Sequence, residues 1–305
     1  MRYRQLGRSG LTVSSVGLGC NNFGTRCDLD QSRAVVDAAI DAGITLLDTS
    51  DTYGNRGGSE TMLGEILRGR RDQVALATKF GSDMGGGPDE ARGSRRYVRR
   101  AVEASLRRLQ TDHVDLYQLH RPDPLTPIAE TLVALDELVK EGKVRYIGSS
   151  NLTAWQMADA DWVARTEHRE RFISAQNHLN LLERAEEKEL LPACERFGVG
   201  VLPFYPLANG LLTGKYRRSE GAPKNTRMAG REISDDTYDR LESLEDFAKQ
   251  RGHSLLELSI SALASMPAVS SVIAGATRPD QVTANAAAGD WELGPTDLAA
   301  LVEIG

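Results

Sequence analysis

Short β-type runs alternate with helical patterns along almost the whole chain. Several runs are nearly continuous apolar stretches, as expected for strands that are covered on both faces. The eight runs are Val13–Gly19, Ile44–Thr49, Val74–Lys79, Val114–His120, Val144–Ser149, Phe172–Gln176, Gly200–Phe204 and Ser270–Gly275. Alternation of strand and helix is typical of a parallel sheet wound with crossover helices. Eight such units predict an α/β fold, a closed (β/α)8 or TIM barrel.

The segments between the runs carry apolar residues at spacings of three and four, which indicates amphipathic helices. The clearest are Ser32–Ala42, Ser94–Leu109, Pro127–Glu141 and Glu186–Phe197. Gly43, Gly142 and Gly198 stand just past three of them, where a residue with positive φ commonly ends a helix. Near the N-terminus, Tyr3–Leu6 and Thr12–Val13 flank Gly-Arg-Ser-Gly and can form a hairpin that caps the barrel bottom. In that case the first barrel strand starts a little later.

The length and composition agree with this fold. The chain has 305 residues, of which 40% are hydrophobic, with 29 Gly and 11 Pro, so it can bury a full core and is not of low complexity. Barrels of this type run to about 250 residues or more as one domain, so residues 1–305 are predicted to form a single domain.

The charge balance argues against nucleic acid as a partner. There are 37 Lys and Arg against 43 Asp and Glu, a net charge of −6, whereas a protein that binds the phosphate backbone needs a basic surface. The basic run Arg92–Arg108 carries Val98, Val102 and Leu106 at helical spacing, which indicates a helix with a solvated charged face.

The remaining compositional features favour a cytoplasmic protein without a membrane partner. The N-terminal residues lack an apolar signal segment, and no uncharged apolar stretch approaches 18 residues. Cys20, Cys27 and Cys194 show no C-x-x-C spacing, so neither a disulfide framework nor a zinc site is predicted. The histidines lack paired ligand spacing, and no metal is expected.

A long irregular stretch, Ala208–Ser234, follows the seventh strand. It contains Gly210, Gly214, Gly221, Pro223 and Gly230 and has little periodicity. An insert of this length in a compact domain is commonly functional. Its position predicts that it lies over the C-terminal face of the barrel, where active sites of this fold are built.

Polar residues interrupt the apolar runs at their C-terminal ends. The second strand ends in Asp48 and continues to Asp51 and Tyr53, Lys79 ends the third, and His120 ends the fourth. In a barrel these ends meet at one mouth, so the side chains are expected to converge.

Such a group has a definite chemical use. A Tyr hydroxyl is a weak acid, and a nearby Lys cation lowers its pKa by favouring the phenolate, which makes Tyr53 a competent proton donor. Asp48 is expected to keep Lys79 charged and oriented, and His120 can donate a hydrogen bond to the same substrate oxygen.

Four motifs carry a resemblance to a known family. DTSDTYG (48–54), ATKF (77–80), DLYQLHRPD (115–123) and GSSN (148–151) resemble the aldo-keto reductase family, in strand order and over nearly the whole chain. The resemblance implies that Asp48, Tyr53, Lys79 and His120 form the catalytic tetrad of a carbonyl reductase. It also implies a nicotinamide cofactor, usually NADPH, bound across the C-terminal face without a Rossmann domain. No G-x-G-x-x-G follows a strand and opens a helix, which agrees.

The resemblance also assigns cofactor contacts. Ser150, Asn151 and Gln176 would bind the nicotinamide carboxamide, and Phe204, where the family commonly has Tyr, or its neighbour Tyr205 would stack on the ring. Leu207, Asn209, Leu211, Gly214 and Lys215 would surround the pyrophosphate, and Gly275, Thr277, Arg278, Gln281 and Asn285 would hold the adenosine 2′-phosphate and adenine. The preference for NADPH over NADH would depend mainly on Arg278.

The substrate is predicted to be a small-molecule carbonyl compound, with Asn21, Asn22, Phe23 and Arg121 placed to line the mouth. Two other functions stay open at this stage. A strand-end Lys79 can form a Schiff base, as in a barrel aldolase. The family that the motifs resemble also has relatives similar to channel β-subunits, which bind NADPH tightly and turn over slowly, and this implies an NADPH-binding, redox-sensing subunit as a further possibility.

Overall fold

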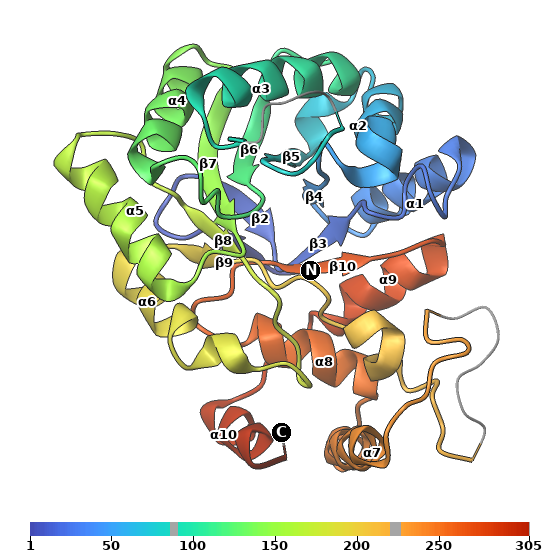
Figure 1. The fold of residues 1–305 in the computed structure, drawn as a ribbon. Helices are drawn as coiled ribbons and strands as arrows, with labels where there is room; N and C mark the ends of the chain where they lie inside the picture. The colour runs from blue at the N-terminus through green and yellow to red at the C-terminus, as the bar shows by residue number, and fades with distance from the viewer. Residues whose placement is uncertain (86–90, 220–226, 305) are drawn as a thin grey trace.

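Eight parallel strands form a curled sheet at the centre of the molecule in the computed structural model (Figure 1), which describes residues 1–85, 91–219 and 227–304. The strands are β3 Val16–Gly19, β4 Leu46–Asp48, β5 Ala75–Phe80, β6 Val114–Leu119, β7 Val144–Ser150, β8 Ser174–Gln176, β9 Gly200–Val201 and β10 Val272–Gly275. Each strand from β3 to β8 pairs with the next in chain order, and β10 pairs with β3. Backbone bonds such as Ile273 N–H to the Pro203 carbonyl (2.9 Å) close the ring between β9 and β10. The predicted (β/α)8 barrel is confirmed.

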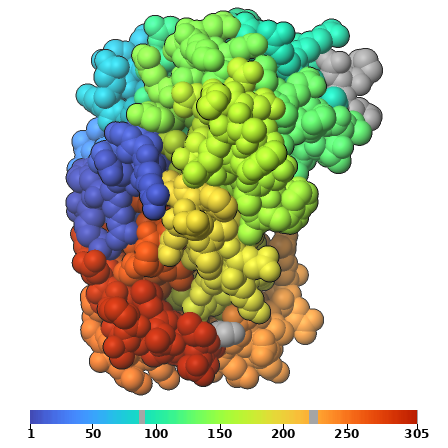
Figure 2. Space-filling model, turned by 90° about the vertical axis from the view of Figure 1, so that its left-hand side faces the viewer, coloured from blue at the N-terminus to red at the C-terminus, as the bar shows by residue number. Residues whose placement is uncertain are grey.

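The N-terminal hairpin is also confirmed. β1 (Tyr3–Gln5) pairs antiparallel with β2 (Thr12–Ser14), and β3 begins two residues later, so the predicted first run divides into two strands. Leu6 and Val13 of the hairpin segment pack in one buried cluster with barrel residues that include Leu46 and Leu116. The hairpin therefore closes the N-terminal end of the barrel, whereas the polar residues lie at the C-terminal ends of the strands. Figure 2 shows this blue segment lying against the yellow α6 region and the red C-terminal region.

Helices surround the sheet in the alternating order that the sequence predicts (Figure 1). They are α1 Leu29–Asp41, α2 Tyr53–Ile66, α3 Arg95–Leu109, α4 Ile128–Lys140, α5 Ala154–Thr166, α6 Leu190–Phe197, α7 Asp235–Lys249, α8 Leu255–Ala264, α9 Pro279–Ala288 and α10 Pro295–Ile304. Gly43, Gly142 and Gly198 have φ of 78°, 75° and 73°, as their positions after helices predict. Among the described residues, no helix is both long and apolar enough to span a membrane.

The stretch after β9 is more ordered than its sequence suggests. It opens with a 3₁₀ helix, η3 (Ala208–Thr213), whose Leu212 is fully buried. Arg217 pairs with Glu245 of α7 at 2.6 Å, and Arg218 pairs with Asp235 of α7 at 2.7 Å. These contacts fix the first part of the stretch on α7, while residues 220–226, including Gly221 and Pro223, lie outside the described residues.

Candidate active site

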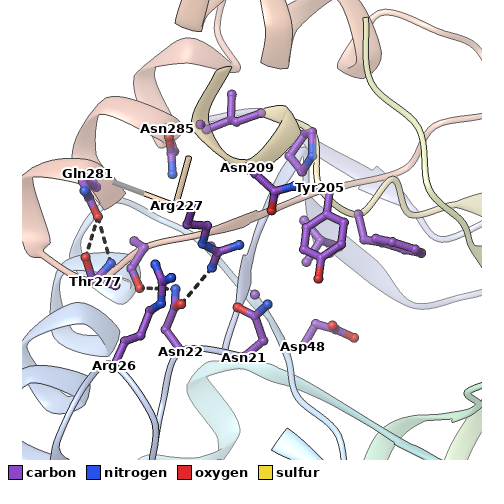
Figure 3. A pocket seen from close by; sticks show the side chains of 18 of the residues that line it. Asn21, Asn22, Arg26, Asp48, Tyr205, Asn209, Arg227, Thr277, Gln281 and Asn285 are labelled. Carbon is purple, nitrogen blue, oxygen red and sulfur yellow. Dashed lines mark hydrogen bonds between the residues drawn. The ribbon is translucent and has the colours of Figure 1, made fainter. Parts of the chain in front are cut away.

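A cavity of about 810 Å³ opens at the C-terminal ends of the barrel strands. Nineteen of the residues predicted for the site line it: Asn21, Asn22, Asp48, Tyr53, His120, Arg121, Ser150, Asn151, Gln176, Phe204, Tyr205, Leu207, Asn209, Lys215, Gly275, Thr277, Arg278, Gln281 and Asn285. The barrel thus brings together residues that are separated by up to 264 positions in the chain, from Asn21 to Asn285. Figure 3 shows the side chains entering the cavity from several different elements.

Lys79 lies beneath the cavity floor and connects two of its residues. Its Nζ lies 2.6 Å from Asp48 Oδ2, 2.9 Å from the Thr49 carbonyl oxygen and 3.4 Å from Tyr53 Oη. The Lys79 side chain is 0% exposed. The buried ammonium therefore has its charge balanced by one carboxylate and touches one phenol.

Asp48 is held from a second direction. Its other oxygen, Oδ1, accepts hydrogen bonds from Gln176 Nε2 at 2.9 Å and from Gln118 Nε2 at 3.2 Å. Gln118 on β6 was not among the predicted site residues, although the alternation along β6 puts its side chain on the same face of the strand as Leu116. Two amide donors and one ammonium thus fix both carboxylate oxygens.

The pKa directions define the charge states of the two connected groups. Burial acts to lower the pKa of Lys79, but the Asp48 carboxylate and the Tyr53 hydroxyl outweigh it and raise that pKa above its ordinary value. Lys79 therefore stays an ammonium ion, which is the wrong state for Schiff-base formation because only a neutral amine attacks a carbonyl carbon.

The pKa of Tyr53 differs from the sequence-based expectation. Burial raises it, the charge of Lys79 lowers it, and the net direction is upward. The prediction that Lys79 brings the Tyr53 pKa below its ordinary value is therefore wrong for the net effect, because burial of the phenol outweighs the cation. Tyr53 is fully protonated at neutral pH, which is the form that can donate a proton.

A left-handed turn places Tyr53 at the start of α2. The three residues that follow it, Gly54, Asn55 and Arg56, have φ of 69°, 58° and 69°. A Cβ on Gly54 would lie 2.4 Å from Ser59 N and 2.6 Å from the Phe23 carbonyl oxygen. Only glycine fits there, and the strained turn directs Tyr53 back toward Lys79.

Gly54→Ala is expected to destabilise the fold by more than the roughly 1–3 kcal/mol of a strained backbone position, because the new methyl group also meets backbone atoms. Gly69→Ala is the matched control, since Gly69 has a φ of 75° but nothing within 4 Å of its Cβ position. Urea unfolding of both variants measures the difference. Equal losses in the two variants would contradict a packing requirement at Gly54.

His120 stands beside Tyr53 with its ring neutral. The two rings meet edge-on with centroids 5.9 Å apart. Burial, and then the charges of Lys79 and Arg121, lower the pKa of His120 to about 3. Its Nδ1 lies 3.1 Å from Ser50 Oγ and 3.1 Å from Ser82 Oγ. Across the described part of the chain no side chain hydrogen-bonds Nε2, so this nitrogen is the one that a ligand can use.

An amide-rich wall lies next to this group. Ser150 Oγ donates to the Gln176 carbonyl at 2.8 Å, and Asn151, in the left-handed region with φ of 59°, donates to the His120 carbonyl at 2.9 Å. The donor groups of this wall therefore bond within the protein. No donor of the described residues reaches Asn151 Oδ1 or Gln176 Oε1, so both oxygens can accept from a ligand amide.

The two aromatic residues after β9 differ in their contacts. Phe204 stacks on His178 with ring centroids 5.4 Å apart, and Tyr205 meets Phe204 nearly at right angles. Tyr205 is 41% exposed and its ring projects into the cavity (Figure 3). Both rings line the cavity, and Tyr205 has the more open face.

The opposite end of the cavity is basic. Lys215 and Arg278 line it as predicted, but Arg278 forms a bidentate pair with Asp280, at 3.0 and 2.9 Å. Two further arginines, Arg26 and Arg227, also line it and were not predicted. Arg227 donates to Asn22 Oδ1 at 2.9 Å and so connects the loop before α7 to the loop after β3 (Figure 3).

These two arginines have no acidic partner within the described ranges of the chain. Burial and the nearby charge of Arg26 lower the pKa of Arg227. A second cavity, of about 290 Å³, lies beside the first and shares with it Asn21, Asn22, Arg26 and Arg227. This end of the site is suited to an anion.

Besides Lys79, three predicted residues do not line the cavity. Phe23 is fully buried in the hydrophobic core, because the loop after β3 folds back through bonds such as Phe23 N–H to the Cys20 carbonyl and turns the ring inward. Its predicted place in the substrate pocket is wrong. Leu211 packs against the cluster around α7 and α8, and Gly214 ends η3 with a φ of 76°. The neighbouring residues Gly210 and Thr213 line the cavity instead.

Comparison with known proteins agrees with this geometry. Residues 15–305 match the sequence model of the Aldo/keto reductase family. The chain belongs to this family. It is 37% identical to the uncharacterized oxidoreductase YrpG of Bacillus subtilis, over 92% of this chain and 89% of that protein. It is 36% identical to a probable voltage-gated potassium channel subunit beta of Oryza sativa (93% and 90% covered) and 35% identical to the L-glyceraldehyde 3-phosphate reductase of Escherichia coli (93% and 86% covered).

Proposed function

We propose that this aldo/keto reductase family member is an NADPH-dependent reductase that converts the carbonyl group of an aldehyde or ketone into an alcohol. The observation that carries the proposal is the buried Lys79, which contacts both Asp48 and Tyr53 next to the neutral ring of His120. A phenol, a cation and a neutral imidazole around one point of a cavity suit a reaction in which a carbonyl oxygen gains negative charge and then a proton.

The residues have separate roles in this reaction. His120 Nε2 donates a hydrogen bond that holds the substrate oxygen, and Tyr53 Oη delivers the proton. The Lys79 ammonium stabilises the phenolate that Tyr53 becomes, and Asp48 keeps Lys79 charged and in place. NADPH, when bound, supplies the hydride. The protein thus contributes orientation and charge stabilisation.

The polar and charged groups that line the cavity fit this cofactor. Amide oxygens lie next to the tetrad, where a carboxamide needs acceptors, and cations lie at the far end, where phosphates need them. By family resemblance the first end consists of Ser150, Asn151 and Gln176 with the rings of Phe204 and Tyr205, and the second of Leu207, Asn209, Lys215, Gly275, Thr277, Arg278, Gln281 and Asn285. Arg26 and Arg227 add two cations that no carboxylate of the described residues occupies, whereas Arg278 is already paired with Asp280 through Nε and Nη2.

Arg227→Ala is expected to weaken NADPH binding by about 10- to 100-fold, which corresponds to the roughly 1.5–3 kcal/mol of a hydrogen bond to a charged group. Arg145→Ala, which removes an equal charge from the exposed start of β7, is the control. Fluorescence titrations of both variants with NADPH measure the change, and a parallel NADH series identifies the phosphate. An unchanged NADPH affinity in Arg227→Ala would remove Arg227 from the cofactor site.

A regulatory subunit is the second candidate function. It is favoured by the similarity to probable potassium channel β-subunits over 93% of the chain. The tetrad geometry does not distinguish the two, because a slow enzyme can keep the same residues. Turnover does distinguish them: tight NADPH binding without reduction of any aldehyde, ketone or dicarbonyl would favour the regulatory subunit.

A further inference from the structure

A chain of hydrogen bonds connects His120 to a carboxyl group that the proposed reaction does not use. Ser50 Oγ lies 3.1 Å from Asp51 Oδ1 and 3.1 Å from His120 Nδ1. Ser50 is fully buried and Asp51 is 2% exposed. Because a hydroxyl group has one hydrogen, Ser50 can donate to Asp51 or to His120, and not to both at once.

Few neighbouring groups stabilise a negative charge on the buried Asp51 carboxylate. Its Oδ2 is buried without a hydrogen-bond partner in the described structure, and the side-chain donor to Oδ1 is Ser50. The Lys79 ammonium is directed at Asp48 and not at Asp51. The other titratable and charged groups around Asp51 are Glu60 on α2, Tyr97 and Arg108 on α3, Tyr117 on β6 and His120 just after β6. Arg108 is already bound to Glu60 at 2.6 Å.

These surroundings favour a neutral carboxyl group. Burial and then the charge of Glu60 raise the pKa of Asp51 to about 7, although Ser50, Arg108 and the Thr52 backbone N–H act in the opposite direction. Asp51 therefore changes charge near neutral pH, and it lies two hydrogen bonds away from Nδ1 of the His120 ring.

We propose that proton binding at Asp51 decides, through Ser50, which ring nitrogen of His120 carries the hydrogen. With Asp51 neutral, its O–H donates to Ser50 Oγ, Ser50 donates to Nδ1, and the imidazole hydrogen stays on Nε2. With Asp51 ionised, Ser50 donates to Asp51 and accepts from Nδ1–H, so Nε2 is bare. The only proton lost to solvent is that of Asp51; the imidazole keeps one hydrogen in both states.

The consequence rests on the proposed function. A carbonyl oxygen needs the Nε2–H donor, whereas an alcohol hydroxyl can donate to a bare Nε2. Ionisation of Asp51 therefore disfavours reduction and favours the reverse reaction. The Ser82 hydroxyl, whose Oγ also lies 3.1 Å from Nδ1, can donate to a bare Nδ1 or accept from Nδ1–H, so it is compatible with both forms. Asp51 and Ser50 are positioning residues, because they act on the substrate only through His120.

The direct test observes the His120 tautomer in the free protein. Long-range ¹H–¹⁵N spectra of ¹⁵N-histidine-labelled protein are recorded from about pH 5.5 to 8.5, with the His120 signals identified by their loss in His120→Gln. We expect the Nε2–H pattern at low pH and the Nδ1–H pattern at high pH, with the midpoint near the Asp51 pKa of about 7. A single tautomer over the whole range would overturn the proposal.

Two variants and one control make the test specific. Ser50→Ala and Asp51→Asn are each expected to abolish the pH-dependent transition while the folded signal dispersion is kept. Thr52→Val removes a hydroxyl that lies 3.1 Å from Ser50 Oγ but is outside the chain of bonds, and it is expected to keep the transition. Persistence of the transition in Ser50→Ala, or its loss in Thr52→Val, would contradict a relay through Ser50.

An activity measurement separates this inference from the proposed function. The rate of carbonyl reduction by the wild-type chain is expected to fall about tenfold from about pH 6 to 8, as Asp51 ionises, and the fall is expected to disappear in Ser50→Ala. A tautomer transition without any turnover would support the relay and reject the reductase function. Turnover without a transition would support the reductase and reject the relay.

Discussion

Tyr53→Phe is expected to reduce carbonyl turnover by about 10²–10⁴-fold, the usual contribution of a positioned general acid. The phenyl ring keeps the shape of the site, but the hydroxyl that lies 3.4 Å from Lys79 Nζ is lost. No other hydroxyl in the described structure contacts Lys79 Nζ. The affinity for NADPH is expected to stay within a few-fold, because the variant removes no cation or amide from the cofactor end.

The matched control is Tyr205→Phe, which removes a phenolic hydroxyl from the same cavity but from a residue that is not among the described hydrogen-bond partners of Lys79 Nζ. We expect the control to keep most of its turnover. Steady-state rates and NADPH titrations of both variants measure the difference. Near-normal turnover by Tyr53→Phe would reject Tyr53 as the proton donor, and equal losses in the two variants would show a general effect on the cavity.

Asp48→Asn is expected to lower the free energy of unfolding by about 3–5 kcal/mol, because it leaves the Lys79 ammonium buried without a counter-charge. The pair is joined at 2.6 Å, with the side chains 0% and 3% exposed. The double variant Asp48→Asn with Lys79→Met removes both charges and is expected to recover much of the loss. Urea unfolding at neutral pH measures all three chains.

The exposed ion pair of Arg278 and Asp280 is the control for the buried pair of Asp48 and Lys79. Its side chains are 62% and 66% exposed, so Asp280→Asn is expected to change stability little. A small loss for Asp48→Asn, similar to that for Asp280→Asn, would mean that the buried Lys79 ammonium needs no counter-charge. That result would contradict the role of Asp48 as the group that keeps Lys79 charged.

The strand-end residues could be predicted because the strand pattern is regular. Period and polarity place Asp48, Lys79 and His120 at the ends of consecutive strands, and barrel closure then brings them together. Tyr53 could be placed by its position after the second strand and by the DTSDTYG motif. The turn that follows it could not be predicted, since two of its four consecutive residues with positive φ, Asn55 and Arg56, are not glycine.

Residues on loops could not be located in this way. Arg26 and Arg227 have no periodic neighbours, and the only signal for Arg227 was its position in a stretch predicted to cover the mouth. Phe23 was placed in the pocket because it follows a strand, but the loop reverses and buries it. The pKa of Tyr53 was predicted in the wrong direction for a related reason: the sequence shows the neighbouring cation, and only the structure shows the burial that outweighs it.

Direct transfer of hydride from the nicotinamide to a substrate carbon is the most immediate test of the proposed reductase. The protein is incubated with NADPH that carries deuterium at C4 of the nicotinamide, with an aromatic aldehyde, a short aliphatic aldehyde and a 1,2-dicarbonyl compound as separate substrates. Mass spectrometry of the products locates the label. We expect deuterium on the carbinol carbon of at least one alcohol product, dependent on Tyr53. NADPH binding without any labelled alcohol, or no binding, would contradict the proposed function.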